Sequence, residues 1–193
     1  MKSFLPEREM LEMFADLLRY PCGGEADVAA KGAAALSSEY PGAASLLGEV
    51  RSFFADTPRE RVEEIFTATF DLQATCAPYV GFHLFGEGYK QRVFLAGLSA
   101  MYSSRGFSAA RELPDHITVV LRFLAGPAED EEAGILLEDG LVPSLSKMIG
   151  KFGDDGNPYR DVLRALQSVL LPTFDGDTAE AGGGQPETEV GTP

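Results

Sequence analysis

The chain has 193 residues, 45% of them hydrophobic, a length that suits one compact domain with a single core. The 30 acidic and 16 basic residues give a formal net charge of −14, and no cluster of Lys and Arg is present, which argues against a nucleic-acid-binding protein. The two cysteines, Cys22 and Cys76, form no CxxC pair, as expected of free thiols in a reducing compartment.

The N-terminal stretch MKSFLPEREMLEMF has acidic residues from position 7 and lacks the apolar region of a secretory signal. The longest charge-free stretch, residues 72–86, contains Gln, Thr, Pro and Gly. It is shorter than the roughly 18 to 20 apolar residues that cross a bilayer. We therefore expect a cytoplasmic protein that does not insert into a membrane.

Helical periodicity recurs along the chain, whereas the two-residue alternation of a strand does not. The sequence predicts an all-α, single-domain helical bundle of about seven to nine helices over residues 1–174. The predicted helices cover residues 7–19, a part of 26–38, a stretch around 46–54, 57–71, 89–105, 117 onward, 129–150 and 157–171. Residues 175–193 are acidic and Gly-rich and have few large apolar side chains, so we predict a disordered tail.

Proline marks two of the helix starts. In TPRE, Thr57 is the expected cap, Pro58 the first helical residue and Glu60 the partner in a capping box. The apolar stripe of that helix, which includes Phe66 and Phe70, predicts a central position in the bundle. In NPYR, Asn157 is the expected cap of the last helix. Two further signals concern a helix end and a break. Gly106 is expected to close the helix over 89–105, and Gly140 and Pro143 to interrupt the one over 129–150.

Asp71 follows the stretch FTATF, at the helix end where the macrodipole disfavours negative charge. Two interpretations are open. Arg92 can neutralise the carboxylate inside the protein, or a cationic ligand can do so.

The stretch YVGFHLFGEGYKQR, residues 79–92, combines aromatic side chains, Tyr79 and Phe85 among them, with His83, Glu87 and three glycines. This composition predicts a bend between helices whose aromatic rings face a cleft. His83 and Glu87 are four residues apart and could hold a metal only on a continuous helix, which the glycines oppose. We expect no metal site and interpret the pair as a hydrogen-bonding lock on the bend. The glycine spacing also differs from that of a phosphate-binding loop.

The stretch ELPDH precedes the helix that begins at Ile117. If Pro114 is the first helical residue, Leu113 takes the cap position, where it offers no acceptor. In a structural interpretation, Asp115 complements the helix dipole and His116 bonds a nearby carbonyl. In a functional one, Glu112, Asp115 and His116 form a polar rim beside an apolar groove that receives a peptide with hydrophobic and basic residues.

The protonation of His116 is open at this point. A neighbouring Asp115 raises the pKa of an imidazole, whereas a helix N-terminus lowers it. A small helical enzyme or nucleotide-binding protein that uses Asp115 and His116 is an alternative function. Against it, the sequence shows neither a nucleophile in a recognisable setting nor a cofactor fingerprint.

In their order, LLRYP, FTATFD, GFHLFGE and RELPDHITVVLRFLA, with NPYRDVL near the end, resemble one known family. It is that of the delta-subunit chaperones of respiratory nitrate reductase, the NarJ branch of the TorD/DmsD family of molybdoenzyme maturation chaperones. The resemblance spans roughly residues 7 to 171. One departure is Val93, which stands where the family's motif has a glycine.

The resemblance implies a non-enzymatic chaperone with no cofactor of its own. Its expected partner is the N-terminal segment of a molybdoenzyme catalytic subunit, held in the cytoplasm until the molybdenum cofactor is inserted. In exported relatives this segment is a twin-arginine signal. The family also implies a monomer or a domain-swapped dimer, and we expect the hinge at residues 81–88 or 153–156. The predicted client-peptide site consists of Glu112, Leu113, Pro114, Asp115, His116, Phe66, Phe70, Asp71, Tyr79, His83, Phe85 and Glu87.

Overall fold

The structure, a computed structural model, describes residues 8–72, 76–127, 131–153 and 156–171. Within these ranges the regular elements are helices, which confirms the all-α prediction. They are α1 (Arg8–Leu17), α2 (Glu25–Leu36), α3 (Pro41–Asp56), α4 (Arg59–Phe70), α5 (Val80–Phe85), α6 (Tyr89–Ser104), α7 (Ile117–Leu124), α8 (Glu131–Ile135), the π-helix η1 (Leu136–Leu141), α9 (Val142–Ile149) and α10 (Pro158–Leu170). The tail predicted at 175–193 lies outside the described residues.

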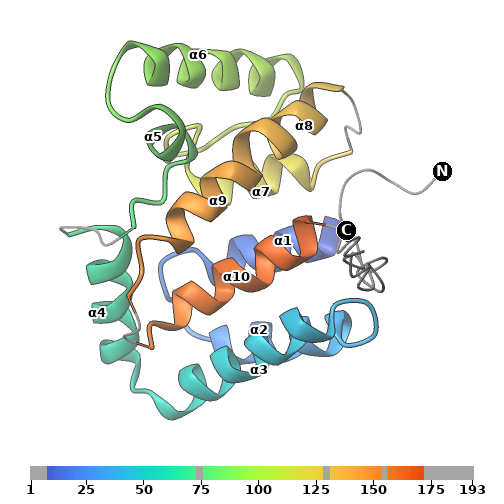
Figure 1. The fold of residues 1–193 in the computed structure, drawn as a ribbon, viewed down its shortest axis with the longest axis vertical. Helices are drawn as coiled ribbons and strands as arrows, with labels where there is room; N and C mark the ends of the chain where they lie inside the picture. The colour runs from blue at the N-terminus through green and yellow to red at the C-terminus, as the bar shows by residue number, and fades with distance from the viewer. Residues whose placement is uncertain (1–7, 73–75, 128–130, 154–155, 172–193) are drawn as a thin grey trace, which may run out of the picture.

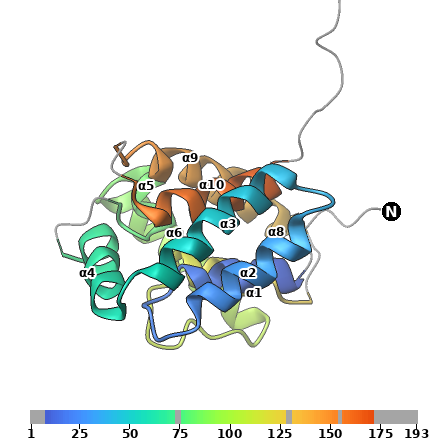
Figure 2. The same cartoon turned by 90° about the horizontal axis from the view of Figure 1, so that it is seen from below.

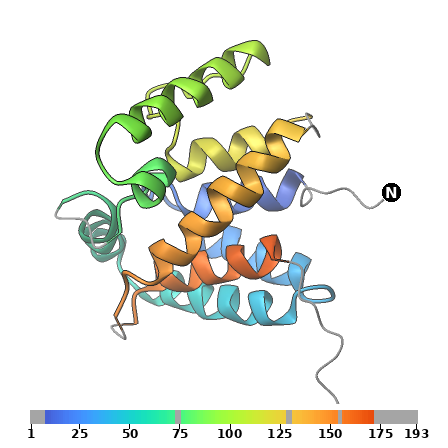
Figure 3. The same ribbon diagram turned by 45° about the horizontal axis from the view of Figure 1, so that its top comes forward.

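The helices pack in two groups around one core. In the first, α3 packs against α2 and α10, and α1 packs against α2 (Figure 1). In the second, α9 and η1 pack against α5, and α6 packs against α5 at the end of the molecule farthest from α2 and α3 (Figures 1 and 3). Helix α7 packs against η1 of the second group. Its contacts with α1, and those between α9 and α10, join the groups. Most of the apolar stripes predicted from the sequence face this shared core. The stripe of α6 does so in part, through Leu98 and Tyr102.

Helix α4 lies at one edge of the molecule, so the prediction of a central position is wrong (Figures 1 and 2). Its apolar stripe is nevertheless buried, because Phe66 and Phe70 contact the ring of Tyr159 edge to face, with centroids 5.5 and 5.1 Å away. The Asn157 side chain donates to the Thr69 hydroxyl at 2.8 Å and fixes the same end of the helix. A one-sided stripe is what an edge helix needs, and it does not require burial on all sides.

The two proline-marked helix starts differ. At α10, the Asn157 side chain accepts from the Tyr159 N–H at 3.0 Å and Pro158 is the first helical residue, as predicted. At α4 the helix begins at Arg59, and no side chain at the cap position accepts a hydrogen bond. The capping box predicted there from Thr57 and Glu60 is therefore wrong.

The predicted interruption near Gly140 and Pro143 is a π-helical segment, η1, between α8 and α9. Pro143 has no N–H for an α-helical bond, and the Val142 N–H reaches back five residues to the Leu137 carbonyl. The predicted closure of α6 is confirmed, since Gly106 follows it with φ +63°.

Both cysteines are unpaired, Cys22 exposed and Cys76 buried. Burial raises the pKa of the Cys76 thiol to about 12, which keeps it protonated and unreactive. None of the described helices has both the length and the apolar character that a membrane span requires.

Candidate functional site

Two extended segments pair antiparallel, one just before α5 and the other just before α7. The Ile117 N–H donates to the Pro78 carbonyl at 2.8 Å, and the Val80 N–H donates to the Asp115 carbonyl at 2.9 Å. We call these four residues, with the residues between them, the latch. The latch joins the ELPDH stretch to the start of the glycine-rich bend, two motifs that are far apart in the sequence.

The ELPDH stretch itself forms a turn. The His116 N–H donates to the Leu113 carbonyl at 3.0 Å, with Pro114 at the second position, which suits its fixed φ. The Tyr102 hydroxyl donates to the Pro114 carbonyl at 2.8 Å and holds the turn against α6. Helix α7 begins at Ile117, so the arrangement with Pro114 as the first helical residue is wrong.

Asp115 is buried, with 0% of its surface exposed, and the predicted position on a rim is therefore wrong. Its Oδ2 accepts from the Gly81 N–H at 3.1 Å, whereas Oδ1 is buried without a hydrogen-bond partner. Burial raises the pKa of this carboxyl, and the Gly81 bond opposes that effect. The side chain thus holds α5 against the turn and cannot meet a partner directly.

His116 is the N-cap of α7, and its Nδ1 accepts from the Thr118 N–H at 3.3 Å. Nδ1 therefore carries no proton in this arrangement. Burial lowers the pKa of the imidazole, Glu112 raises it, and Arg122 lowers it. Burial, the largest of these effects, favours the neutral ring, and the opposing effect comes from Glu112 rather than from Asp115. The ring also contacts that of Tyr79, with centroids 5.6 Å apart.

The predicted bend is found at residues 86–88, between the end of α5 at Phe85 and the start of α6 at Tyr89. The first half of the stretch is the helix α5, which the sequence did not predict. His83 and Glu87 consequently do not share a helix. The lock on the bend comes from His83 alone, whose Nε2 lies 2.7 Å from the Ala77 carbonyl oxygen. Burial lowers the pKa of this imidazole too. Glu87 is exposed.

The predicted residues of α4 are split between core and surface. Phe66 and Phe70 are buried against Tyr159. Asp71 follows the helix and is exposed, so water can solvate its carboxylate. Among the ion pairs of the described residues none joins Asp71 to Arg92.

An apolar groove of about 640 Å³ opens between α6, the end of α5 and the α8–η1 segment. Its lining residues are Leu84, Phe85, Phe94, Gly97, Leu98, Ala100, Met101, Ser104, Glu132, Ile135, Leu136, Asp139 and Gly140. Two large apolar side chains in it stay open to solvent, Phe85 at 45% and Ile135 at 52% exposed. Of the predicted site residues only Phe85 lines this groove. The apolar stripe of α6 was visible in the sequence, but the wall from α8 and η1 was not.

Gly81 connects the latch to the groove. A Cβ at this position would lie 2.9 Å from the Asp115 Oδ2 and 2.8 Å from Cδ1 of Phe94, a groove residue. Only glycine allows the carboxylate and the aromatic ring to approach the same backbone atom this closely. A shift of Asp115 would therefore reach the groove wall through one residue.

The arrangement favours binding over catalysis. Asp115 has no contact with solvent, and the Nδ1 of His116 is engaged in a helix cap. Over the described ranges, no group of three His, Cys, Asp or Glu side chains could hold a metal ion. An open apolar groove next to a rigid turn suits an extended or helical polypeptide.

Comparison with known proteins agrees with this geometry. The sequence profile of a family described as "Nitrate reductase delta subunit" matches residues 33–149. A crystal structure from Archaeoglobus fulgidus, of a protein described as a candidate redox enzyme maturation protein, aligns with a TM-score of 0.58 and 22% identity. The alignment covers 84% of this chain and 93% of that one, and it shows a shared fold. The comparison with curated proteins gives no significant match.

Proposed function

The chain belongs to the nitrate reductase delta subunit family, and on that premise we propose that it is a maturation chaperone rather than an enzyme. It acts in the cytoplasm on the catalytic subunit of a molybdoenzyme related to nitrate reductase. It binds the N-terminal segment of that subunit and holds it until the molybdenum cofactor is in place. The observation that carries this proposal is the open apolar groove beside α6.

The groove has the chemistry that an apolar and basic client segment needs. Apolar client side chains would cover Phe85 and Ile135 and remove their exposed surface from water, at roughly 25 cal/mol per Å². Two carboxylates stand among the lining residues. Glu132 is paired with Arg105 at 2.8 Å, so exposed Asp139 is the one offered to a client Lys or Arg. The net charge of −14 would speed the arrival of such a segment.

The predicted site residues take two roles in this proposal. Those with exposed or half-buried side chains contact the client, and the buried ones position the latch and α4. The first set is Asp71, Tyr79, Phe85, Glu87, Glu112, Leu113, Pro114 and His116; the second is Phe66, Phe70, His83 and Asp115. A client that reaches from the groove to the latch would meet Leu113, which is 51% exposed.

The direct test is calorimetric titration with a synthetic peptide that copies the N-terminus of the molybdoenzyme catalytic subunit made in the same cells. The Phe85→Ser, Ile135→Gln double variant removes apolar surface from the groove and should weaken binding at least about tenfold, or 1.4 kcal/mol. The matched control is Tyr89→Ser, Val93→Gln, an aromatic and a β-branched change at exposed residues outside the groove.

Equal loss of binding in both double variants would mean that the groove is not the binding site for the peptide. If the unmodified protein did not bind the peptide, the N-terminal segment would not be what the protein recognises. In cells, deletion of this protein should lower the molybdenum content of the partner enzyme. Fully loaded enzyme in the deletion strain would contradict the chaperone role.

A further inference from the structure

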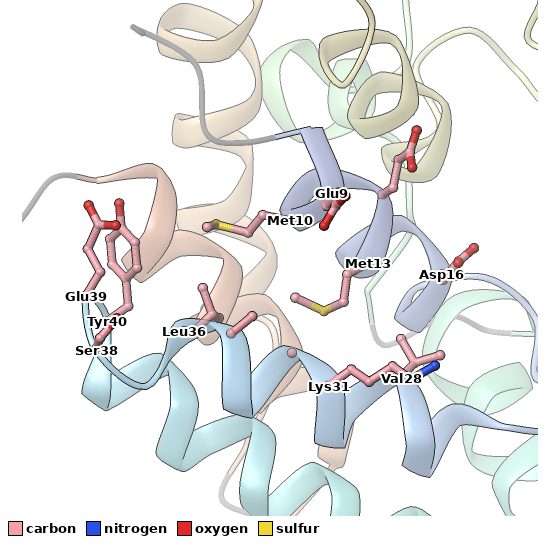
Figure 4. Close-up of a pocket in the computed structure, with 13 residues that line it drawn as sticks. Glu9, Met10, Met13, Asp16, Val28, Lys31, Leu36, Ser38, Glu39 and Tyr40 are labelled. Atoms are coloured by element: carbon pink, nitrogen blue, oxygen red, sulfur yellow. The ribbon is translucent and has the colours of Figure 1, made fainter. Parts of the chain in front are cut away.

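A second pocket, of about 580 Å³, lies between α1 and α2 and shares no residue with the groove (Figure 4). We propose that this pocket, called the methionine pocket below, docks an amphipathic helix of another polypeptide, apolar on one face and flanked by Lys or Arg. The lining residues are Glu9, Met10, Glu12, Met13, Asp16, Val28, Lys31, Gly32, Ala35, Leu36, Ser38, Glu39 and Tyr40. The inference does not rest on the chaperone proposal.

The apolar part of the pocket comes from both helices. Met10 and Met13 are one turn apart on α1, both half-buried, and Figure 4 shows them extending from that helix with Val28 and Leu36 on the facing helix. Methionine side chains are flexible and polarisable, so they adapt to different apolar partners. An opening between two helices presents a groove that a third helix fills with residues one turn apart.

Gly32 sets the depth of the methionine pocket. A Cβ at this position would lie 2.9 Å from the Met13 sulfur and 2.9 Å from Cδ1 of Leu47. The glycine is therefore a notch that lets Met13 lie close to the α2 backbone. Without it, the thioether would have to move.

The rim of the pocket is acidic. Four carboxylates, Glu9, Glu12, Asp16 and Glu39, stand against one ammonium group, that of Lys31. Glu12 and Asp16 are each within 3.5 Å of an arginine side chain, so their charge is partly offset. Glu9 and Glu39 are exposed and take part in none of the ion pairs found among the described residues. An unbalanced acidic rim around an apolar floor favours a basic amphipathic partner.

Charge also argues against other occupants. A second copy of the chain carries the same net charge of −14. Residues 172–193 contain Asp and Glu but neither Lys nor Arg. Both would place further carboxylates beside Glu9 and Glu39. Charge therefore favours a separate polypeptide of the opposite sign over these two. Residues 1–6 contain Lys2 and no acidic residue, so they are the occupant that the test must distinguish from it.

The test is an NMR titration of the full chain labelled with ¹³C in the methionine methyl groups. The probe is a synthetic peptide of Leu and Lys in helical periodicity, and the same peptide with Glu in place of Lys is its control. Met10 and Met13 report on the methionine pocket, Met101 on the groove, and Met148, which is fully buried, on the core. The Leu–Lys peptide should shift Met10 and Met13 in a saturable way and leave Met148 unchanged, and the Leu–Glu peptide should shift neither.

The variant pair separates the pocket from the charge of the whole protein. Glu9→Lys, Glu39→Lys should weaken binding at Met10 and Met13 at least tenfold. The control Glu49→Lys, Glu60→Lys changes the net charge equally at exposed glutamates outside the pocket and should weaken it less than threefold. Thermal unfolding should be similar for both variants, because all four side chains are exposed.

Three outcomes would overturn the proposal. Shifts confined to Met101 would place the peptide in the groove and leave the chaperone proposal intact. Equal weakening by both charge variants would mean attraction by net charge alone. If removal of residues 1–6 shifts both Met10 and Met13 without any peptide and tightens peptide binding at them, the N-terminal segment is the occupant that the peptide displaces.

Discussion

Gly81 lies between the latch and the groove, and the two regions differ in which side chains they bury. The latch buries a polar side chain, and the groove exposes apolar ones. Asp115, an acidic residue in a loop, has no exposed surface, whereas Phe85 and Ile135 are apolar and about half exposed. The polar group of the latch is occupied with a backbone N–H group, and the apolar groups of the groove stay open to solvent. The difference indicates that the polar motif holds the structure in place, and it supports the proposal that the apolar surface meets the partner.

The largest effect is expected at Gly81, which lies between Asp115 of the latch and Phe94 of the groove. Gly81→Ala places a methyl group 2.8 Å from Phe94 and 2.9 Å from Asp115. The gain in helix propensity does not offset this overlap, so we expect the free energy of unfolding to fall by about 1–3 kcal/mol. Client-peptide affinity should fall with it, because Phe94 lines the groove. Denaturant unfolding and calorimetry measure the two effects.

Gly48→Ala is the matched control, since Gly48 lies on α3 outside the groove and a Cβ there meets nothing within 4 Å. It should raise the stability by about 0.4–1 kcal/mol through helix propensity and leave affinity nearly unchanged. If Gly81→Ala proved as harmless as Gly48→Ala, the latch and the groove would not be coupled through Gly81.

The second largest effect concerns the charge of the latch. Burial raises the pKa of Asp115 in the folded protein above its usual 3.8, so folding is favoured below that pH and this contribution is lost as the pH rises through the folded pKa. Asp115→Asn mimics the protonated carboxyl and keeps an acceptor for the Gly81 N–H. At pH 7 we expect it to stabilise the fold by on the order of 1 kcal/mol.

The check is denaturant unfolding of the unmodified protein and of the Asp115→Asn variant from pH 7 down to pH 3.5. The stability advantage of the variant should shrink as the pH falls, while its client-peptide affinity at pH 7 stays unchanged. A marked loss of affinity at unchanged stability would show instead that the carboxylate meets the client directly.

Local sequence signals predicted where several helices begin and end. They did not predict the features that depend on contacts between distant parts of the chain. Asn157 and Pro158 start α10, and Gly106 ends α6, because caps and left-handed glycines act within a few residues. The burial of Asp115 depends on Gly81, which is 34 positions away, so its neighbours in the sequence could not reveal it. The groove needs α6 and η1 side by side, and periodicity within either helix says nothing about their pairing.

A smaller effect distinguishes the imidazole of the latch from its carboxylate. Burial lowers the pKa of His116 below its usual 6.5, so its contribution to stability is present above pH 6.5 and is lost as the pH falls through the folded pKa. His116→Asn keeps an acceptor for the Thr118 N–H at the cap and cannot be protonated. The difference at pH 7.5 should stay within about 0.5 kcal/mol.

Thermal unfolding at pH 7.5 and pH 5 measures this dependence. The unmodified protein should lose more stability than the variant on acidification. His83 has the same direction of pKa shift, so some loss should remain in the variant. An identical pH dependence in both proteins would mean that His116 is protonated without cost in the fold.

The smallest effect concerns the exposed carboxylate next to the latch. Glu112 is exposed and raises the pKa of both Tyr79 and His116. Its negative charge therefore interacts with both rings of the latch. Glu112→Gln should therefore leave stability unchanged and weaken the client peptide by less than about 1 kcal/mol at low salt, and by nothing measurable at about 1 M salt. Titration at the two salt concentrations tests this. If Glu112→Gln instead lowered the affinity more than the Phe85→Ser, Ile135→Gln double variant, the turn would contribute more to binding than the groove. The partner would then be recognised by the turn, and the apolar groove would serve another purpose.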